Sequence, residues 1–509
     1  MLCSWYLSYP LTIDSVDDVL FNHISILYWI SLTLVSTSLL LIGITFKNNS
    51  YNWIISVALF ITLFSLSYFF VMSTGSDSQY FRGFNEYFME TKNLNPLQPN
   101  HWYYQWPSFF MLSYVSTSVS GLSLANFEFL LYTIIGFLIS VSLNFYASRT
   151  IKTDVSRKFK IASFLIIPAF IISMYNFFNY QCVPFSLALG LLFLIFMIET
   201  FQKSSGLTVV VIILYLSISI THVFVPIFLI LYLLIRTIIE RNRHYGNLFL
   251  ISSVVFLLIQ ITLAQYGLAN NILRILESSL EYSIIVSRTL APISSPIDII
   301  AQMFSRIATF AFIILCGVGF LFLLIKKRLK PLDKSILITG IIYSGLGVFL
   351  SSLGWRAIIL AFIPISLGVL WFFERKSKIY LKYVFSALII ALLVMFTFIP
   401  LHHSFSNSVN FQTIEAHRTD NFLIQHYKLE DFTTIYAGFR VITYLQSRTN
   451  HTNLTPRFEN GKDAEVVLYT VELGKALLNE NYTMGKLFSE EMLCSAYNNG
   501  HSFIAVKAR

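Results

Sequence analysis

The chain has 509 residues, of which 56% are hydrophobic and only 12% are charged, and its mean hydropathy is +0.67. Soluble globular proteins carry about 25% charged residues, so this composition excludes an ordinary soluble domain. The formal net charge of +9 comes from short basic clusters between apolar runs, a pattern typical of cytoplasmic loops rather than of a nucleic-acid-binding surface. We therefore expect an integral membrane protein, with the lipid bilayer as a partner and no nucleic-acid partner.

Apolar runs of about 17 to 25 residues, long enough to cross the hydrocarbon core, recur from residue 24 to residue 400. They predict an all-α polytopic membrane domain over residues 1–400. About twelve transmembrane helices are expected, at residues 24–46, 52–72, 126–148, 161–177, 184–201, 207–221, 223–239, 247–266, 304–325, 335–352, 357–373 and 380–400.

The sequence becomes mixed and polar after Pro400, which marks a boundary with a C-terminal domain at residues 401–509. Residues 434–437 and 466–470 are β-like runs, and the stretch 439–447 between them is helix-like. We expect a small α/β or α+β domain that helps to engage an acceptor.

The basic residues between the predicted spans fix a topology. If the spans alternate, one face of the membrane collects 19 of the 25 Lys and Arg residues that precede the tail. The positive-inside rule makes that face cytoplasmic. Both termini and the C-terminal domain are then extracytoplasmic, and we predict a multi-pass protein of the plasma membrane, in the cell envelope.

Residues 73–125 form the first large outer loop of this topology. The segment 107–121 is apolar but short, and counting it as a span would place the basic cluster 149–160 outside. We expect instead a surface-lying or re-entrant helix after Pro107. An amphipathic helix near residues 80–89 precedes it, with a face predicted to lie on the membrane that carries Tyr80, Phe84, Tyr87 and Phe88.

Asp77 lies at the start of this amphipathic helix. A carboxylate there either complements the positive end of the helix dipole or acts, beside lipid, as a catalytic base or ligand. The residues leave both interpretations open. Arg82 and Glu86, on the same helix, are candidate substrate-binding residues.

Residues 101–107 form an aromatic cluster at interface depth. It is either an aromatic belt or the lining of a pocket for a sugar or a lipid head group. Rings combined with amide and imidazole donors suit hydroxyl-rich ligands, so His101, Tyr104 and Gln105 are candidate substrate-binding residues.

Three further candidates occupy outer turns between spans. Arg356 is one of six basic residues on the outer side before the tail, and a guanidinium there grips a phosphate or snorkels to lipid head groups. His222 adds a donor to the same phosphate or is an interfacial hydrogen-bonding residue. Gln181 is a candidate substrate-binding residue.

The order of these features resembles that of the GT-C glycosyltransferase superfamily. An acidic residue, Asp77, follows an early span in the first outer loop, and aromatic residues and a helix that starts at a proline come next. His222 and Arg356 follow at later outer helix ends, and the resemblance covers about residues 52–375.

The resemblance implies an inverting transfer of a sugar from a polyprenyl-phosphate-linked donor to a protein, lipid or glycan acceptor on the outer face. Asp77 would be the catalytic carboxylate. Arg356 and His222 would hold the phosphate whose negative charge grows as the glycosidic bond breaks.

The chain departs from the superfamily pattern in its acidic residues. Ser78 follows Asp77, so the pattern lacks the paired acidic residues that hold a metal in many members, and no metal-binding residue is assigned. A divalent cation, Mg or Mn, stays an open alternative. A transporter of a lipid-linked glycan and a glycan polymerase or ligase of another membrane fold are the competing functions. Paired intramembrane charges and two halves with matching interrupted helices are typical of transporters, and the sequence shows neither feature.

Overall fold

The fold was obtained as a computed structural model. It describes the following residues: Phe21, 24–45, 52–63, Ser65, 73–74, 76–94, 102–150, 184–200, 205–264, 296–325, 331–349, 378–404 and the strand residues 411–412, 435–436, 454–455, 466–469, 493–498 and 503–507.

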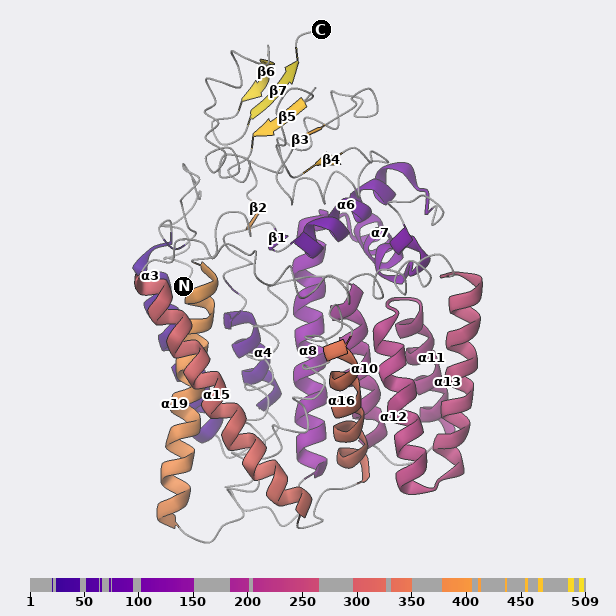
Figure 1. Ribbon diagram of the computed structural model, residues 1–509, viewed down its shortest axis with the longest axis vertical. Coiled ribbons are helices and arrows are strands. Elements are labelled where there is room, and N and C mark those ends of the chain that lie inside the picture. The colour runs from indigo at the N-terminus through magenta and orange to yellow at the C-terminus, as the bar shows by residue number, and fades with distance from the viewer. Residues whose placement is uncertain are drawn as a thin grey trace.

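Long helices run side by side along the longest axis of the molecule and dominate the described part of the chain (Figure 1). They are α3 (Ile26–Thr45), α4 (Asn52–Leu63), α8 (Leu124–Thr150), α10 (Pro184–Thr200), α11 (Ser205–Ser219), α12 (Phe224–Glu240), α13 (Arg243–Thr262), α15 (Pro296–Ile325), α16 (Pro331–Phe349) and α19 (Lys378–Ser404).

Five segments within these helices are long and apolar enough to cross a membrane: Ile26–Thr45, Asn126–Leu143, Arg243–Thr262, Ile299–Phe322 and Tyr383–Leu401. Large apolar side chains on their outward faces are exposed, as at Ile314, Leu257 and Ile390. Lipid is the solvent that accepts such a surface. The expectation of a helical membrane protein is confirmed at this level.

Each predicted span that falls on described residues coincides with a helix. The predicted spans 161–177 and 357–373 lie outside the described residues, so the full number of spans stays a prediction. Some helices begin before the predicted span. In α13, for example, the Asn242 side chain accepts a hydrogen bond from the His244 backbone N–H at 3.0 Å, and this cap starts the helix at Arg243. Hydropathy marks only the lipid-embedded part of a helix, which explains the difference.

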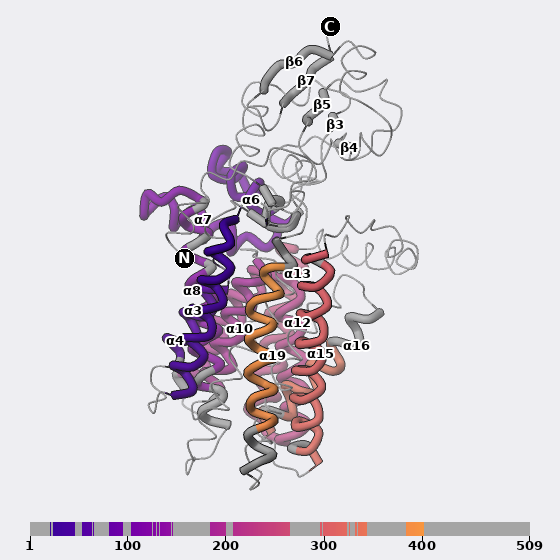
Figure 2. Tube along the Cα trace, turned by 90° about the vertical axis from the view of Figure 1, so that its left-hand side faces the viewer, coloured from indigo at the N-terminus to yellow at the C-terminus, as the bar shows by residue number. Residues whose placement is uncertain are grey.

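Two further helices, α6 (Ser76–Thr91) and α7 (Ser108–Ser120), lie at one end of the bundle, which we call the α6 end (Figures 1 and 2). The short 3-10 helix η2 (Trp102–Gln105) lies between them in the chain. Two pairs of neighbouring long helices run antiparallel. The Thr33 and Thr397 hydroxyls, 3.4 Å apart, join the start of α3 to the last turns of α19. The Tyr343 hydroxyl donates to the Phe224 carbonyl at 2.7 Å and joins the second half of α16 to the start of α12.

Small residues allow close helix contacts within the bundle. A Cβ added to Gly136 of α8 would overlap the ring of Phe60 on α4, which is itself buried. Membrane helices gain association energy from such close packing, because lipid gives them no hydrophobic drive to associate. The α4–α8 contact therefore depends on the missing side chain at Gly136.

All the described strands except β1 belong to the tail. β1 (Ser73–Thr74), in the first loop, pairs antiparallel with β2 (Phe411–Gln412), which joins the start of this loop to the segment after α19. A mixed sheet has the order β4-β3-β5-β7-β6. Its strands are β3 (Ile435–Tyr436), β4 (Leu454–Thr455), β5 (Val466–Tyr469), β6 (Leu493–Asn498) and β7 (Phe503–Lys507). β3 and β5 fall on the two predicted β-like runs, whereas the helix-like stretch 439–447 lies outside the described residues. A separate domain at 401–509 stays a prediction.

Candidate functional site

The aromatic face of α6 packs against protein. Phe84 and Phe88 are buried, and the Phe84 ring lies 5.1 Å from the ring of Tyr104 and 5.7 Å from that of Phe110. The Tyr104 hydroxyl donates to the Phe84 carbonyl at 2.7 Å. The prediction that this face lies on the membrane is wrong for Phe84 and Phe88, because residues of η2 and α7 pack against them. Periodicity identifies the apolar face of a helix but not the partner that buries it.

Arg82 is enclosed in an ion-pair network between α6 and α8. Arg82 as a whole residue is 2% exposed. Its Nη2 lies 3.3 Å from Glu128 Oε2, and its Nε lies 3.7 Å from Glu86 Oε1, one turn along the same helix. A buried guanidinium needs such partners because leaving it unpaired is costly. This network fixes α6 to a spanning helix, while substrate binding by Arg82 and Glu86 stays a prediction.

We expect the Glu128→Gln variant to be less stable than the wild type by about 1–3 kcal/mol, because a buried guanidinium loses one charged partner and keeps the other. The midpoint of thermal unfolding in mild detergent measures this. Glu90→Gln, an exposed position near the end of the same helix, is the matched control and should change stability by less than about 0.5 kcal/mol. Equal midpoints for the two variants would show that the Arg82 network contributes nothing to stability.

α7 follows Pro107, as predicted. It ends at Gly121, whose φ of 70° places it in the left-handed region that favours glycine. Its 13 residues span about 20 Å, too short for the hydrocarbon core. Met111, Val115 and Val119 are exposed along one side of this helix, a stripe that suits contact with lipid at the surface.

The first loop meets the turn between α11 and α12 at a contact that we call the Trp106 junction. Trp106 packs with Val223 and Ala264 in one buried cluster. The backbone N–H of Ser108 donates to the Ile220 carbonyl at 3.2 Å. Segments about a hundred residues apart in the chain are therefore joined at the α6 end, and the turn that carries His222 lies directly against the aromatic loop.

His222 is 2% exposed in this turn. Its Nδ1 accepts a hydrogen bond from the Phe224 backbone N–H at 3.1 Å, and its ring lies 5.1 Å from the ring of Phe185 at the start of α10. A neutral imidazole that accepts at Nδ1 carries its proton on Nε2. The local geometry thus selects a tautomer with an N–H donor on the side of the ring away from the α12 backbone.

The remaining predicted residues divide into two groups. Gln105 is buried in η2 at the α6 end, and Asp77 lies in the first turn of α6, although its side chain is outside the description. His101, Gln181 and Arg356 lie outside the described residues. Within the described part of the chain, no group of three His, Cys, Asp or Glu residues is placed to hold a metal ion.

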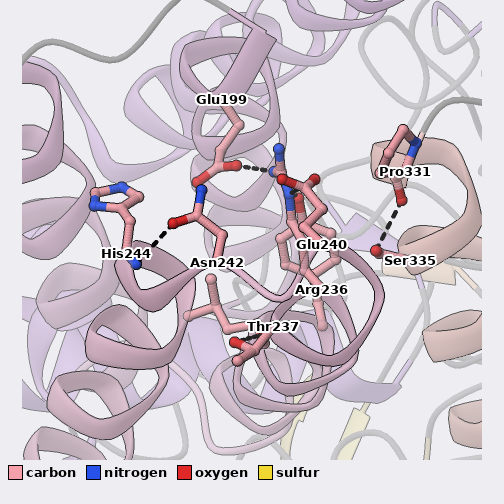
Figure 3. Close-up of polar contacts among 10 residues, drawn as sticks. Glu199, Arg236, Thr237, Glu240, Asn242, His244, Pro331 and Ser335 are labelled. Atoms are coloured by element: carbon pink, nitrogen blue, oxygen red, sulfur yellow. Dashed lines mark hydrogen bonds and ion pairs between the residues drawn. The ribbon is translucent and has the colours of Figure 1, made fainter.

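Figure 3 shows a second ion-pair network, which the sequence analysis missed. It lies at the C-terminal ends of α10 and α12, away from the α6 end. Arg236 of α12 donates from Nε to Glu240 Oε1 at 2.9 Å and from Nη1 to Glu199 of α10 and to the Tyr232 hydroxyl. Its guanidinium carbon lies 4.0 Å from the centre of the Tyr245 ring. The Arg236–Glu240 spacing was visible in the sequence, but the Glu199 contact required the packing of α10 against α12.

Comparison with protein-family models gives no match, and a sequence comparison with curated proteins gives none either. The fold defines the class of this protein as a helical membrane protein.

Proposed function

We propose that the protein is an inverting glycosyltransferase of GT-C type. It moves a sugar from a polyprenyl-phosphate-linked donor to a protein, lipid or glycan acceptor at the outer face of the membrane. The proposal includes about twelve spans and a C-terminal extracytoplasmic domain. It also places both termini outside the cytoplasm.

The Trp106 junction is the observation that carries this proposal. It brings the aromatic segment 102–107 of the first loop and the His222 turn together at one end of the bundle. Asp77, in the first turn of α6, belongs to the same end. An enzyme that acts on a lipid-linked donor needs its polar groups at the rim of the bilayer, next to both lipid and water. The location of the junction at one end of the bundle supports this proposal.

The chemistry assigns one step to each group. The Asp77 carboxylate accepts the proton of the acceptor hydroxyl, and the acceptor oxygen attacks the anomeric carbon of the sugar. The bond between that carbon and the phosphate oxygen breaks, and its electron pair leaves with the polyprenyl phosphate. Arg356 and the Nε2–H of His222 stabilise the negative charge that develops on the phosphate.

A transporter requires a polar path at mid-membrane depth. Among the described residues, the Arg236 network is one charged cluster that could line such a path. However, Glu240 is the last residue of α12, and Glu199 is next to the last residue of α10. From Val223 to Arg236 the helix rises about 20 Å. The network therefore lies near the ends of α10 and α12 that are farther from the α6 end, rather than midway along these helices, and this position gives no support to a transport path.

The proposed function is tested by incubating membranes that contain the full chain with a panel of radiolabelled polyprenyl-phosphate sugars. We expect one donor to be consumed, with release of polyprenyl phosphate and transfer of the label to an acceptor in the membrane fraction. Nucleotide sugars, which lack the lipid, serve as control donors and should not be consumed. Membranes that consume no lipid-linked donor above the background of membranes without the protein would refute the proposal.

A further inference from the structure

Gln260, in the last turn of α13, is a buried amide for which the described part of the chain offers no hydrogen bond. It is 1% exposed, and neither Nε2 nor Oε1 has a partner among the described residues. A side-chain amide provides two donors and two acceptor positions. Burying it without partners loses the hydrogen bonds that water would supply, and an apolar side chain of the same size would avoid this loss. Stability alone therefore does not explain a glutamine here.

The helix periodicity places Gln260 at the Trp106 junction. Phe256, one turn earlier on α13, packs in the cluster formed with Trp106 and Val223, and so does Ala264, which lies two residues after the end of the helix. Residues four apart share a face of a helix, so Gln260 lies on the same face as Phe256, in the last turn before Ala264. Leu257, Leu258 and Ile261 are 55%, 56% and 66% exposed and belong to the other, lipid-facing side.

The surroundings define the kind of group that this amide suits. The junction contains the aromatic residues Trp106, Tyr103 and Phe224, and it is close to the buried His222. An uncharged amide that both donates and accepts matches a hydroxyl group, which does the same, whereas a phosphate needs donors only. The aromatic neighbours exclude water, and a hydrogen bond that the amide forms in such surroundings is stronger than one in water.

We propose that the Gln260 amide binds hydroxyl groups of the donor sugar, as part of a sugar subsite at the Trp106 junction. The inference rests on the proposed function and adds to it a residue that recognises the sugar rather than the phosphate. Binding energy for a hydroxyl is large in such a site, because a missing hydroxyl leaves the amide buried and unpaired.

The test compares the binding of polyprenyl-phosphate sugars with the binding of polyprenyl phosphate alone. The full chain is purified in detergent, and the rise in its midpoint of thermal unfolding with ligand concentration measures the affinity. We expect the wild type to bind one of the sugars more tightly than polyprenyl phosphate. Gln260→Met should lower the affinity for that sugar by about tenfold or more, leave the affinity for polyprenyl phosphate unchanged, and not lower the midpoint without ligand. Gln260→Leu repeats the test if the methionine variant folds poorly.

Ser36→Ala is the matched control, because Ser36, in α3, is another buried polar residue that has no hydrogen-bond partner in the described part of the chain. It should leave both affinities unchanged. If Gln260→Met binds the sugar donor as tightly as the wild type does, the inference is wrong and the proposed function stands. If the wild type binds no lipid-linked sugar more tightly than polyprenyl phosphate, the proposed function fails and this inference fails with it.

Discussion

Replacement of Asp77 by asparagine is expected to reduce sugar transfer by about 10²- to 10⁴-fold, the range that a general base contributes. Asparagine has nearly the same shape as aspartate, but its amide does not accept a proton at neutral pH. Asparagine is also well tolerated near helix N-termini, where residue 77 lies in α6. We therefore expect the fold to persist while the chemistry is lost. The measurement is release of polyprenyl phosphate per unit of purified protein.

Two comparisons separate this outcome from a structural effect. Glu90→Gln removes a carboxylate from the other end of α6 and should leave the rate unchanged. If Asp77 only complements the helix dipole, Asp77→Asn would lower the stability by about 0.3–1 kcal/mol and would leave turnover near normal. Near-normal turnover would therefore remove Asp77 from the catalytic role, even if the enzyme uses a lipid-linked donor.

The helices were predictable because the bilayer demands a long apolar run from each of them. The non-spanning helix α7 was predictable for a different reason. Pro107 and Gly121 bracket it, and both residues act locally, by fixing φ at the start and by allowing a left-handed conformation at the end. Local rules of this kind are readable in a single sequence, without knowledge of which helices are neighbours.

The partners of buried groups were not predictable, because they depend on helix packing. Arg82 and Glu86 stand four residues apart, and so do Arg236 and Glu240, so the intrahelical pairs follow from the sequence. In each case, however, a second carboxylate comes from a neighbouring helix. The prediction for the apolar face of α6 failed for the same reason. The sequence showed the aromatic residues but not that η2 would cover them.

The candidate site is predictable to a similar extent. Alternation of the spans predicted that the first loop and the His222 turn share one side, and the backbone contact from Ser108 to Ile220 joins these two segments. The Gln260 amide escaped attention because a single glutamine in an apolar run carries no pattern. It became visible only when its burial and its missing partners were known.

The second large effect is expected at the Arg236 network. Arg236→Met removes the only cation among the described groups that touch Glu199 and Glu240, and it leaves two carboxylates without that cation, one buried at Glu199 and one partly exposed at Glu240. Loss of one partner from a buried ion pair costs about 3–5 kcal/mol. We expect a correspondingly large fall in the midpoint of thermal unfolding in mild detergent. Arg243→Met, an exposed position in the adjacent turn, should have little effect.

A double variant identifies the cause of that fall. If Arg236→Met destabilises the protein because it leaves two negative charges without their cation, then adding Glu199→Gln removes the buried one and should recover part of the lost stability, about 1–2 kcal/mol. If the loss instead reflects the packing of the Arg236 stem against Tyr245, the second change will recover nothing. A midpoint for Arg236→Met equal to that of the wild type would contradict both explanations and show that α10 and α12 are held together by apolar contacts alone.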